Sequence, residues 1–268
     1  MAFLFLKSNL HPRVSDLMER LAAAGKVASS LLLVLAIWTV VCALKLFPEA
    51  LFPSPASVLA AAIDLWDSGT LMSDLAASVS RAAVGFGIGA VSGVFVGLLT
   101  GRTKLFRALL NPFLTILRPV PAIALVPVAI VWFGIGEGSK YFVISYTVFL
   151  AVWFNTHFGM EYVPDIYLRA SQSLGVSKPR EFLCVIIPAA APHIVSGIRL
   201  GVALAFLSLV AAELTGASSG IGYRLQEARQ YFRTDAMFAL LIELGVLGAI
   251  IDLAFGTLGR RVVHWQQA

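Results

Sequence analysis

Six long apolar blocks separated by shorter polar segments dominate the pattern of this chain. They cover residues 27–47, 79–101, 119–136, 141–159, 194–215 and 237–258. A helix rises ~1.5 Å per residue and the hydrocarbon core of a bilayer is roughly 30 Å thick, so each block is long enough to cross it. The pattern predicts an all-α polytopic membrane protein with six transmembrane helices, made of an N-terminal segment (1–26) and a transmembrane domain (27–268).

The composition agrees with a membrane protein. Hydrophobic residues make up 59% of the 268 positions, charged residues only 13%, and the mean hydropathy is +0.86. The first block is too long and too far from the start for a cleaved signal peptide, so we expect it to remain as the first span. The pI is near 9.4, but the basic residues flank the apolar blocks instead of forming one face. Binding to nucleic acid is therefore disfavoured.

The Lys and Arg residues predict the orientation, because cytoplasmic loops of membrane proteins carry an excess of them. With the N-terminus inside, 14 of the 20 fall in cytoplasmic segments. These are Lys7, Arg13, Arg20, Lys26, Arg102, Lys104, Arg107, Arg118, Arg169, Lys178, Arg180, Arg199, Arg260 and Arg261. We therefore expect both termini, and the polar segment at about 161–190, to be cytoplasmic.

That polar segment contains the run DIYLRASQSLGVSKPREFLCVIIP at residues 165–188. Pro164 suits the first position of a helix, and Gly175 suits the left-handed conformation that often ends one. Ser177 is placed to cap a second helix with Pro179 in its first turn. The run predicts two short helices separated by a sharp stop, forming a basic knob on the cytoplasmic side.

The knob resembles a known functional segment. Its residues follow the spacing of the EAA loop of bacterial ABC importer permeases at Ala170, Ser171, Gly175, Val185, Ile187 and Pro188. In that family the loop is the coupling helix that sits in a groove of the ATPase subunit. The resemblance implies coupling roles for Arg169, Ala170, Ser171, Gly175 and Pro188. Arg169 stands where the family usually has Glu, which puts the role of that carboxylate here in doubt.

Three further stretches extend the resemblance over residues 52–261. They are the FPSP entry at 52–55, the proline-rich third block and the AELTGASSGIGYRLQEARQYFRTD segment. Together they are similar to permeases of the nitrate, sulfonate, taurine and bicarbonate importer group. This resemblance implies a MetI-like fold in the bacterial inner membrane, a second copy of the permease, two cytoplasmic ABC ATPase subunits and a periplasmic or lipid-anchored substrate-binding protein. It also implies a small anionic solute, and ATP and Mg²⁺ held by the ATPase with no cofactor in this chain.

Motifs for other chemistry are missing from the sequence. It holds no GxxxxGK[ST] phosphate loop, no HExxH, CxxC or GxSxG, and its four histidines are scattered. A membrane-embedded enzyme is therefore disfavoured, and no metal site is expected. The alternative that remains is an ion-driven secondary carrier, although we see no internal repeat of the kind such carriers have.

Polar residues within the blocks are candidates for a translocation path or for ion pairs. Proline breaks in the third block are typical of helices near substrate paths. The path candidates are Trp132, Ser145, Thr147, Ser208 and Glu213, with local packing as the alternative for each. Similar depth in neighbouring blocks favours two structural ion pairs, Arg199 with Asp252 and Arg81 with Glu213.

Glycines recur every fourth residue in the second block, at Gly85, Gly89, Gly93, Gly97 and Gly101. This spacing removes side chains from one helix face and lets another helix approach closely. The partner is either a helix of the same chain or one of a second copy.

Overall fold

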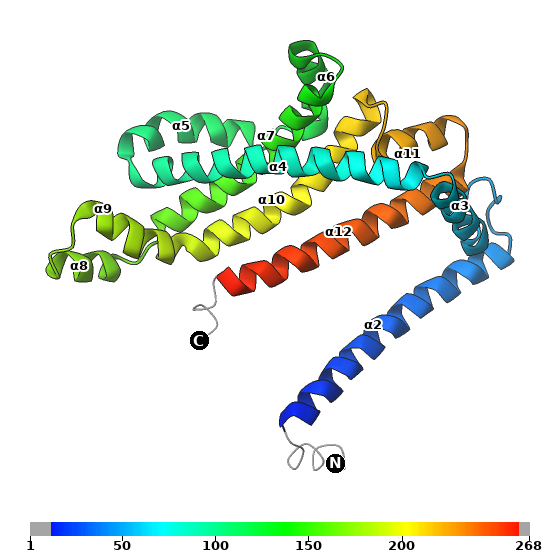
Figure 1. The fold of residues 1–268 in the computed structure, drawn as a ribbon, viewed down its shortest axis with the longest axis horizontal. Coiled ribbons are helices and arrows are strands. Elements are labelled where there is room, and N and C mark those ends of the chain that lie inside the picture. Colours follow the sequence, from blue (N-terminus) through cyan, green and yellow to red (C-terminus); the bar gives the residue numbers. More distant parts are fainter. Residues whose placement is uncertain (1–11, 263–268) are drawn as a thin grey trace.

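The computed structural model describes residues 12–262, and within this range it contains helices and turns with no strands. In chain order the helices are α2 (Pro12–Ala43), α3 (Pro55–Asp67), α4 (Thr70–Arg102), α5 (Lys104–Leu117), α6 (Ala122–Phe133), α7 (Glu137–Glu161), α8 (Asp165–Ser173), α9 (Lys178–Glu181), α10 (Ile187–Gly216), α11 (Ile221–Gln230) and α12 (Thr234–Val262). Figure 1 shows α4, α7, α10 and α12 as long helices side by side, with α8 and α9 at one end and α3 and α11 at the other.

The predicted all-α membrane fold is confirmed. Within the described range, four helices are long and apolar enough to cross a bilayer, or five if the bent pair α5 and α6 is one span. A shorter apolar stretch, Ala28–Ala43, lies in α2, so the arrangement is compatible with the six spans expected. Residues 1–11 of the expected N-terminal segment lie outside the described residues, and α2 begins inside that segment.

The third span differs from its prediction. The sequence pattern started it at residue 119, but the apolar segment begins at Lys104 and is bent by 105° between α5 and α6, as in a broken span or a re-entrant loop. Pro119 and Pro121 lie in the bend, because proline lacks the N–H that a continuing helix needs. The pattern missed α5 because this helix carries polar residues along one face. Arg118 therefore lies at the bend between the two helices.

The glycine stripe of α4 packs against α7 of the same chain. A Cβ atom added to Gly89 would lie 2.5 Å from the backbone oxygen of Ser145, and one added to Gly97 would lie 2.5 Å from Cβ of Thr156. Such distances leave no room for any side chain on this face. The stripe therefore serves close packing within the chain, which decides between the two alternatives.

Helix α7 is the centre of the bundle, because α10 covers another of its faces. Gly197 and Gly201 of α10 approach α7 closely. Val148 and Val152 of α7 are fully buried between α4 and α10, and Trp153 donates a hydrogen bond of 3.1 Å to the Thr100 hydroxyl of α4. An apolar helix surrounded by glycine-rich partners fixes the arrangement of the three helices.

A second core lies where α3, α11 and α12 meet, with Val58, Leu65, Ile221 and Leu240 buried in it. Helix α2 reaches this core through Trp38, whose indole N–H donates to the Pro53 carbonyl (3.0 Å). The remainder of α2 extends away from the bundle (Figure 1).

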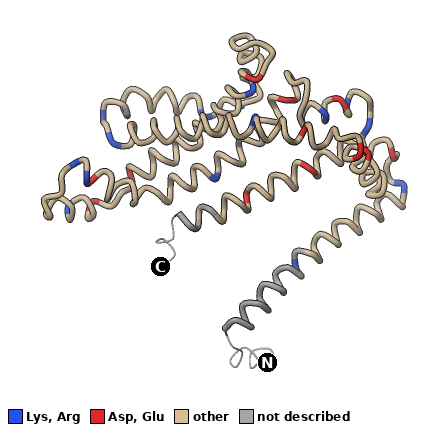
Figure 2. Tube along the Cα trace, in the orientation of Figure 1, with Lys and Arg blue, Asp and Glu red and all other residues tan. Residues whose placement is uncertain are grey.

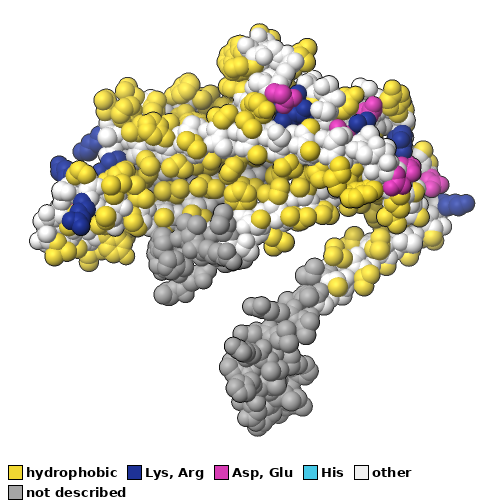
Figure 3. Space-filling model, in the orientation of Figure 1, with side chains coloured by type: hydrophobic (Ala, Val, Ile, Leu, Met, Phe, Trp, Pro, Cys, Tyr) yellow, Lys and Arg dark blue, Asp and Glu magenta, His cyan; other side chains and the backbone are white. Residues whose placement is uncertain are grey.

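Charged residues gather at the two ends of the long helices, with few between them (Figure 2). In the space-filling view, hydrophobic side chains cover most of the visible length between these ends (Figure 3). This distribution is the one that a bilayer requires, since charges at its centre are costly.

Candidate functional site

The predicted stop between two short helices is present in the α8–α9 knob, which we define as residues 165–181. Gly175 has φ +70°, the left-handed conformation expected of it. The Val176 N–H donates to the Ser171 carbonyl and the Gly175 N–H to the Gln172 carbonyl, both at 3.0 Å. This pair of bonds is the Schellman motif, which satisfies carbonyls at a helix end. Helix α9 then starts with Ser177 as its N-cap residue and Pro179 in its first turn, as predicted, although the Ser177 side chain makes no capping bond.

Ser171 faces the interior of the knob. Its hydroxyl donates to Glu181 Oε2 at 2.8 Å, and both side chains are buried. Glu181 also lies 3.5 Å from the guanidinium of Arg102, at the end of α4. Sequence reasoning missed Glu181, because its partners lie ten and 79 residues away. This carboxylate ties α8 to α9, and the knob to the bundle.

The outer surface of the knob is apolar as well as basic. Ile166 is 70% exposed and Leu174 81% exposed, while Arg169 and Ala170 are also exposed. Large exposed apolar side chains on a polar segment mark an interaction surface. Pro188 does not lie on this surface, since it is half-buried in the first turn of α10, after a π-helical turn at Phe182–Ile186.

A buried polar network holds the opposite end of the bundle. We call it the α11 network, and its members are Asp74, Ser78 and Arg81 of α4, Glu137 of α7, Glu213 of α10 and the backbone of residues 219–222. The start of a helix leaves N–H groups without intrahelical acceptors, and here side chains accept from them. The bonds run from Gly220 to Asp74, from Ile221 to Ser78 and from Gly222 to Glu213, at 2.8, 2.9 and 2.9 Å.

Arg81 is the cation at the centre of the α11 network. Its Nη1 lies 2.7 Å from Glu213 Oε1, the contact expected for this pair. Its Nε and Nη2 donate hydrogen bonds to the two carboxylate oxygens of Glu137, at 2.7 and 2.9 Å. Its Nη1 also donates to the Ser219 carbonyl at 2.6 Å. Bidentate pairing of this kind gives strong and directional contacts. Arg81 therefore connects its own helix α4 with α7, with α10 and with the segment that precedes α11.

Sequence reasoning missed Asp74, Ser78 and Glu137. A usable signal existed, because Asp74, Ser78 and Arg81 are spaced four and three residues apart and so lie on one face of a helix. Three polar residues on one face of an apolar helix call for a buried polar partner.

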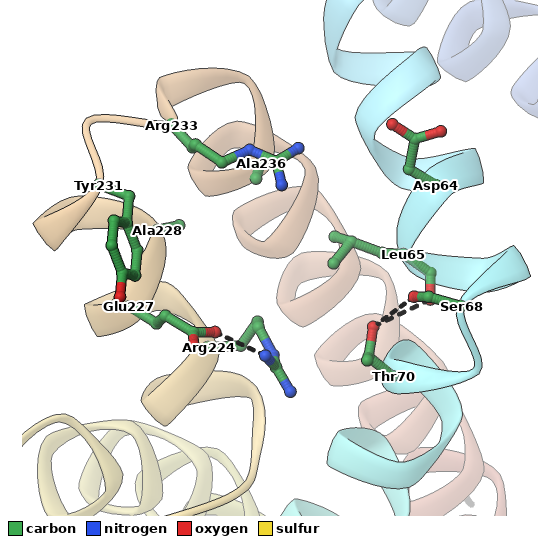
Figure 4. Close-up of a pocket in the computed structure, with 10 residues that line it drawn as sticks. All are labelled: Asp64, Leu65, Ser68, Thr70, Arg224, Glu227, Ala228, Tyr231, Arg233 and Ala236. Carbon is green, nitrogen blue, oxygen red and sulfur yellow. Dashed lines mark hydrogen bonds and ion pairs between the residues drawn. The ribbon is translucent and has the colours of Figure 1, made fainter.

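A cleft of about 450 Å³ lies beside the α11 network, between α3, α11 and α12 (Figure 4). Arg224 lines it and bonds to Asp74 Oδ2 (2.8 Å) and to Glu227 Oε2 (2.5 Å). Burial alone would lower the pKa of Arg224, but these two carboxylates more than offset that effect and raise it. The cleft therefore presents a permanent cation joined to the buried network.

The path candidates fall into different surroundings. Glu213 is 1% exposed and Ser208 is buried with its hydroxyl bonded to its own helix. Ser145 bonds to the Phe142 carbonyl, and Trp132 is exposed on α6 with its ring 5.8 Å from that of Phe142. Thr147 lines the cavity at the α5–α6 bend.

Arg199 and Asp252 contact each other between α10 and α12, with two bonds of 3.0 and 2.8 Å. Their side chains are 53% and 51% exposed in the single chain. Both lie within apolar spans, where a charge without a partner is costly.

We expect Asp252→Asn to lower the yield of folded protein in membranes, because it leaves Arg199 without its counter-ion. The exchange Arg199→Asp with Asp252→Arg should recover part of that yield. The measurement is the monodisperse fraction after extraction in detergent. If both single substitutions leave the yield unchanged, the pair has no structural role.

A family model matches residues 89–264, under the description "Binding-protein-dependent transport system inner membrane component". The chain belongs to this family. It is a transporter subunit and not an enzyme, as expected, and the secondary-carrier alternative is not carried further. No group of three or more His, Cys, Asp or Glu side chains that could hold a metal ion lies among residues 12–262.

Relatives cover most of the chain. The taurine transport system permease protein TauC of Escherichia coli is 32% identical over 88% of this chain and 88% of its own length. The nitrate import permease protein NrtB of Synechocystis sp. is 32% identical, with 90% of both chains covered. SsuC of Bacillus subtilis, named as an aliphatic sulfonates transport permease, is 37% identical over 88% of this chain and 85% of its own.

The fold is similar to that of solved transporter structures. An inward-facing structure of the MetNI methionine ABC transporter matches with a TM-score of 0.60 and 21% identity, covering 69% of this chain and 92% of that one. At this identity the likeness shows the fold alone, which is the MetI-like permease fold that the sequence predicted.

Proposed function

We propose that this chain works as one of a pair of permease subunits that carry a small anionic solute into the cytoplasm. Two ABC ATPases would bind ATP and Mg²⁺ on the inner side, and a periplasmic or lipid-anchored binding protein would deliver the solute outside. Family membership supports the class of transporter. The relatives named for taurine, sulfonates and nitrate support the class of solute, because each of those solutes carries an anionic group.

The orientation proposed has both termini and the α8–α9 knob in the cytoplasm of the bacterial inner membrane. Even without Arg118, 13 of the 20 basic residues fall in the segments proposed as cytoplasmic, about twice as many as the six in the outer segments. The cleft between α3, α11 and α12 then faces the binding protein, for which its mixed charges are suitable.

The α8–α9 knob is the observation that carries the coupling role. A short helix transmits force only if it is held at a fixed angle to the spans, and here Gly175 and Glu181 hold it. Closure of the ATPase dimer would push on exposed Ala170, Ile166 and Leu174. Through Glu181 and Arg102 the push would reach α4, and through the π-helical turn it would reach α10, so that the path changes from inward-facing to outward-facing.

For Ser171 we propose a structural role inside the knob in place of direct contact with the ATPase. Its burial supports a role inside the knob, where it bonds to Glu181, and Arg169 and Ala170 remain as the outward contacts with the ATPase. We propose Pro188 as a pivot at the start of α10 instead of a contact residue.

Gly175→Val and Ala170→Trp are expected to abolish uptake and weaken ATPase association while leaving the bundle folded. A β-branched residue is a misfit at positive φ, and a Trp on the exposed face would hold the two surfaces apart. The measurement is co-purification of the ATPase with each variant, with monodispersity of the permease checked in detergent.

Matched control variants test whether the effects come from the backbone conformation and side-chain size at these positions, or from any substitution there. Gly175→Asn should retain much of the activity, since Asn tolerates the left-handed region, and Ala170→Ser should be close to wild type. If Gly175→Val and Ala170→Trp still bind the ATPase and transport normally, the knob is not the coupling segment.

A further inference from the structure

The bend between α5 and α6 forms one wall of a cavity of about 320 Å³. The other walls are α7 and α10, and the lining is mostly apolar, with Leu150, Leu200 and Leu204 among its residues. Phe154 lines it seven residues before the end of α7, which places this part of the cavity ~10 Å along the helix from that end. The cavity is therefore within the length of the spans and not at their ends.

Arg118 is the single charged residue among those that line this cavity. Its guanidinium carbon lies 3.7 Å from the centre of the Phe154 ring, a cation–π contact that fixes its position. No carboxylate among the side chains that the structure describes lies within ion-pair distance of it. Arg118 is exposed in the single chain. A cation without a counter-ion between the ends of the spans is costly in a bilayer, so it marks a functional position.

The start of α6 is a second, independent feature of the same cavity. Pro121 and Ala122 line it, and α6 begins there with no side-chain cap. The first N–H groups of a 12-residue helix are thus left without side-chain acceptors beside the cavity. The N-terminus of a helix carries a partial positive charge and free donors, which favour anions.

We propose that this cavity is an anion-binding site of the permease itself, on the path of the solute. An oxyanion head, such as a sulfonate or carboxylate, binds between the Arg118 guanidinium and the first N–H groups of α6. A short apolar tail lies against Leu150, Leu200 and Leu204. The proposal rests on the proposed function and deepens it, because it gives this chain its own selectivity for anions, apart from that of the binding protein.

The test uses the full-length purified permease with ethanesulfonate as the probe and ethyl methyl sulfone as its uncharged analogue, at constant ionic strength. At tenfold excess over its Kd, ethanesulfonate should raise the thermal midpoint of the wild type by about 4 °C. The sulfone should not raise it. Arg118→Gln should lose the shift, and Lys104→Gln, which removes an exposed charge from α5 outside the cavity, should keep it.

A second variant tests the site in case Arg118→Gln does not fold. In a chain with Cys42 and Cys184 replaced, Arg118→Cys can be modified after purification. An aminoethyl thiosulfonate reagent, which adds a cation, should restore the shift, and its sulfonatoethyl counterpart should not. The site is overturned by no shift in the wild type, by an equal shift with the sulfone, or by an equal shift in Arg118→Gln.

Uptake separates this site from the proposed function. In proteoliposomes with the ATPase and binding protein, Arg118→Gln should slow uptake about tenfold, the loss expected for one charge-assisted contact. Lys104→Gln should leave uptake unchanged. If the wild-type complex imports no taurine, ethanesulfonate or nitrate with ATP, the proposed function fails. A wild type that imports while Arg118→Gln matches it contradicts the site alone.

Discussion

Glu213→Gln is expected to lower the thermal unfolding midpoint of the permease by about 10 °C. The Glu213 carboxylate is buried and accepts bonds from Ser78, Arg81 and the Gly222 N–H. Removing its charge leaves Arg81 only partly compensated, and breaking a buried pair costs about 3–5 kcal/mol. At roughly 2–4 °C per kcal/mol for a chain of this size, the shift is large enough to measure by thermal unfolding in detergent.

Glu227→Gln is the matched control for this prediction. Glu227 bonds to Arg224 at the rim of the adjacent cleft, and its side chain is 32% exposed. Because partly exposed pairs contribute about 0–1 kcal/mol, we expect a shift of no more than about 4 °C. Equal shifts for the two variants would mean that the α11 network does not hold the bundle together.

Gly89→Ala is expected to reduce both the yield and the thermal midpoint, at a cost of about 1–3 kcal/mol. The new Cβ would lie 2.5 Å from the backbone oxygen of Ser145 and 2.7 Å from the Val148 Cβ. A backbone atom cannot turn away as a side chain does, so the whole of α7 must shift. The measurement is the monodisperse yield together with the unfolding midpoint in detergent.

Gly87→Ala tests whether the effect comes from packing or from helix propensity. Gly87 lies on the same helix, and a Cβ added there meets nothing within 4 Å. This change should be neutral or slightly stabilising, since Ala favours a helix by about 1 kcal/mol over Gly. A loss as large as that of Gly89→Ala would contradict the assignment of the stripe to the α4–α7 contact.

Features of short range were predictable from the sequence. The apolar blocks predicted the spans, because crossing a bilayer depends on the length and polarity of one continuous segment. The stop at Gly175 was also predictable, because the left-handed conformation is a property of one residue and its neighbours. The EAA-like spacing pointed to the α8–α9 knob, because the whole motif lies within one short segment of the sequence.

The partners across the bundle needed the tertiary structure. The spacing of the α4 glycines predicted a close contact, but only the fold showed that α7 of the same chain makes it. Glu213 had one expected partner, whereas the structure also joins it to Ser78, 135 residues away.

The bend between α5 and α6 and the surroundings of Arg118 depended on the fold as well. The length and hydropathy of the blocks, the break at the prolines and the turn at Gly175 follow from the sequence itself, because each is settled within a few neighbouring residues. The amphipathic α5, the position of Arg118 in a cavity and the α11 network follow only from the packed bundle. A polar side chain on a membrane helix is stable wherever packing gives it a partner or a cavity, and packing joins residues that the sequence keeps far apart.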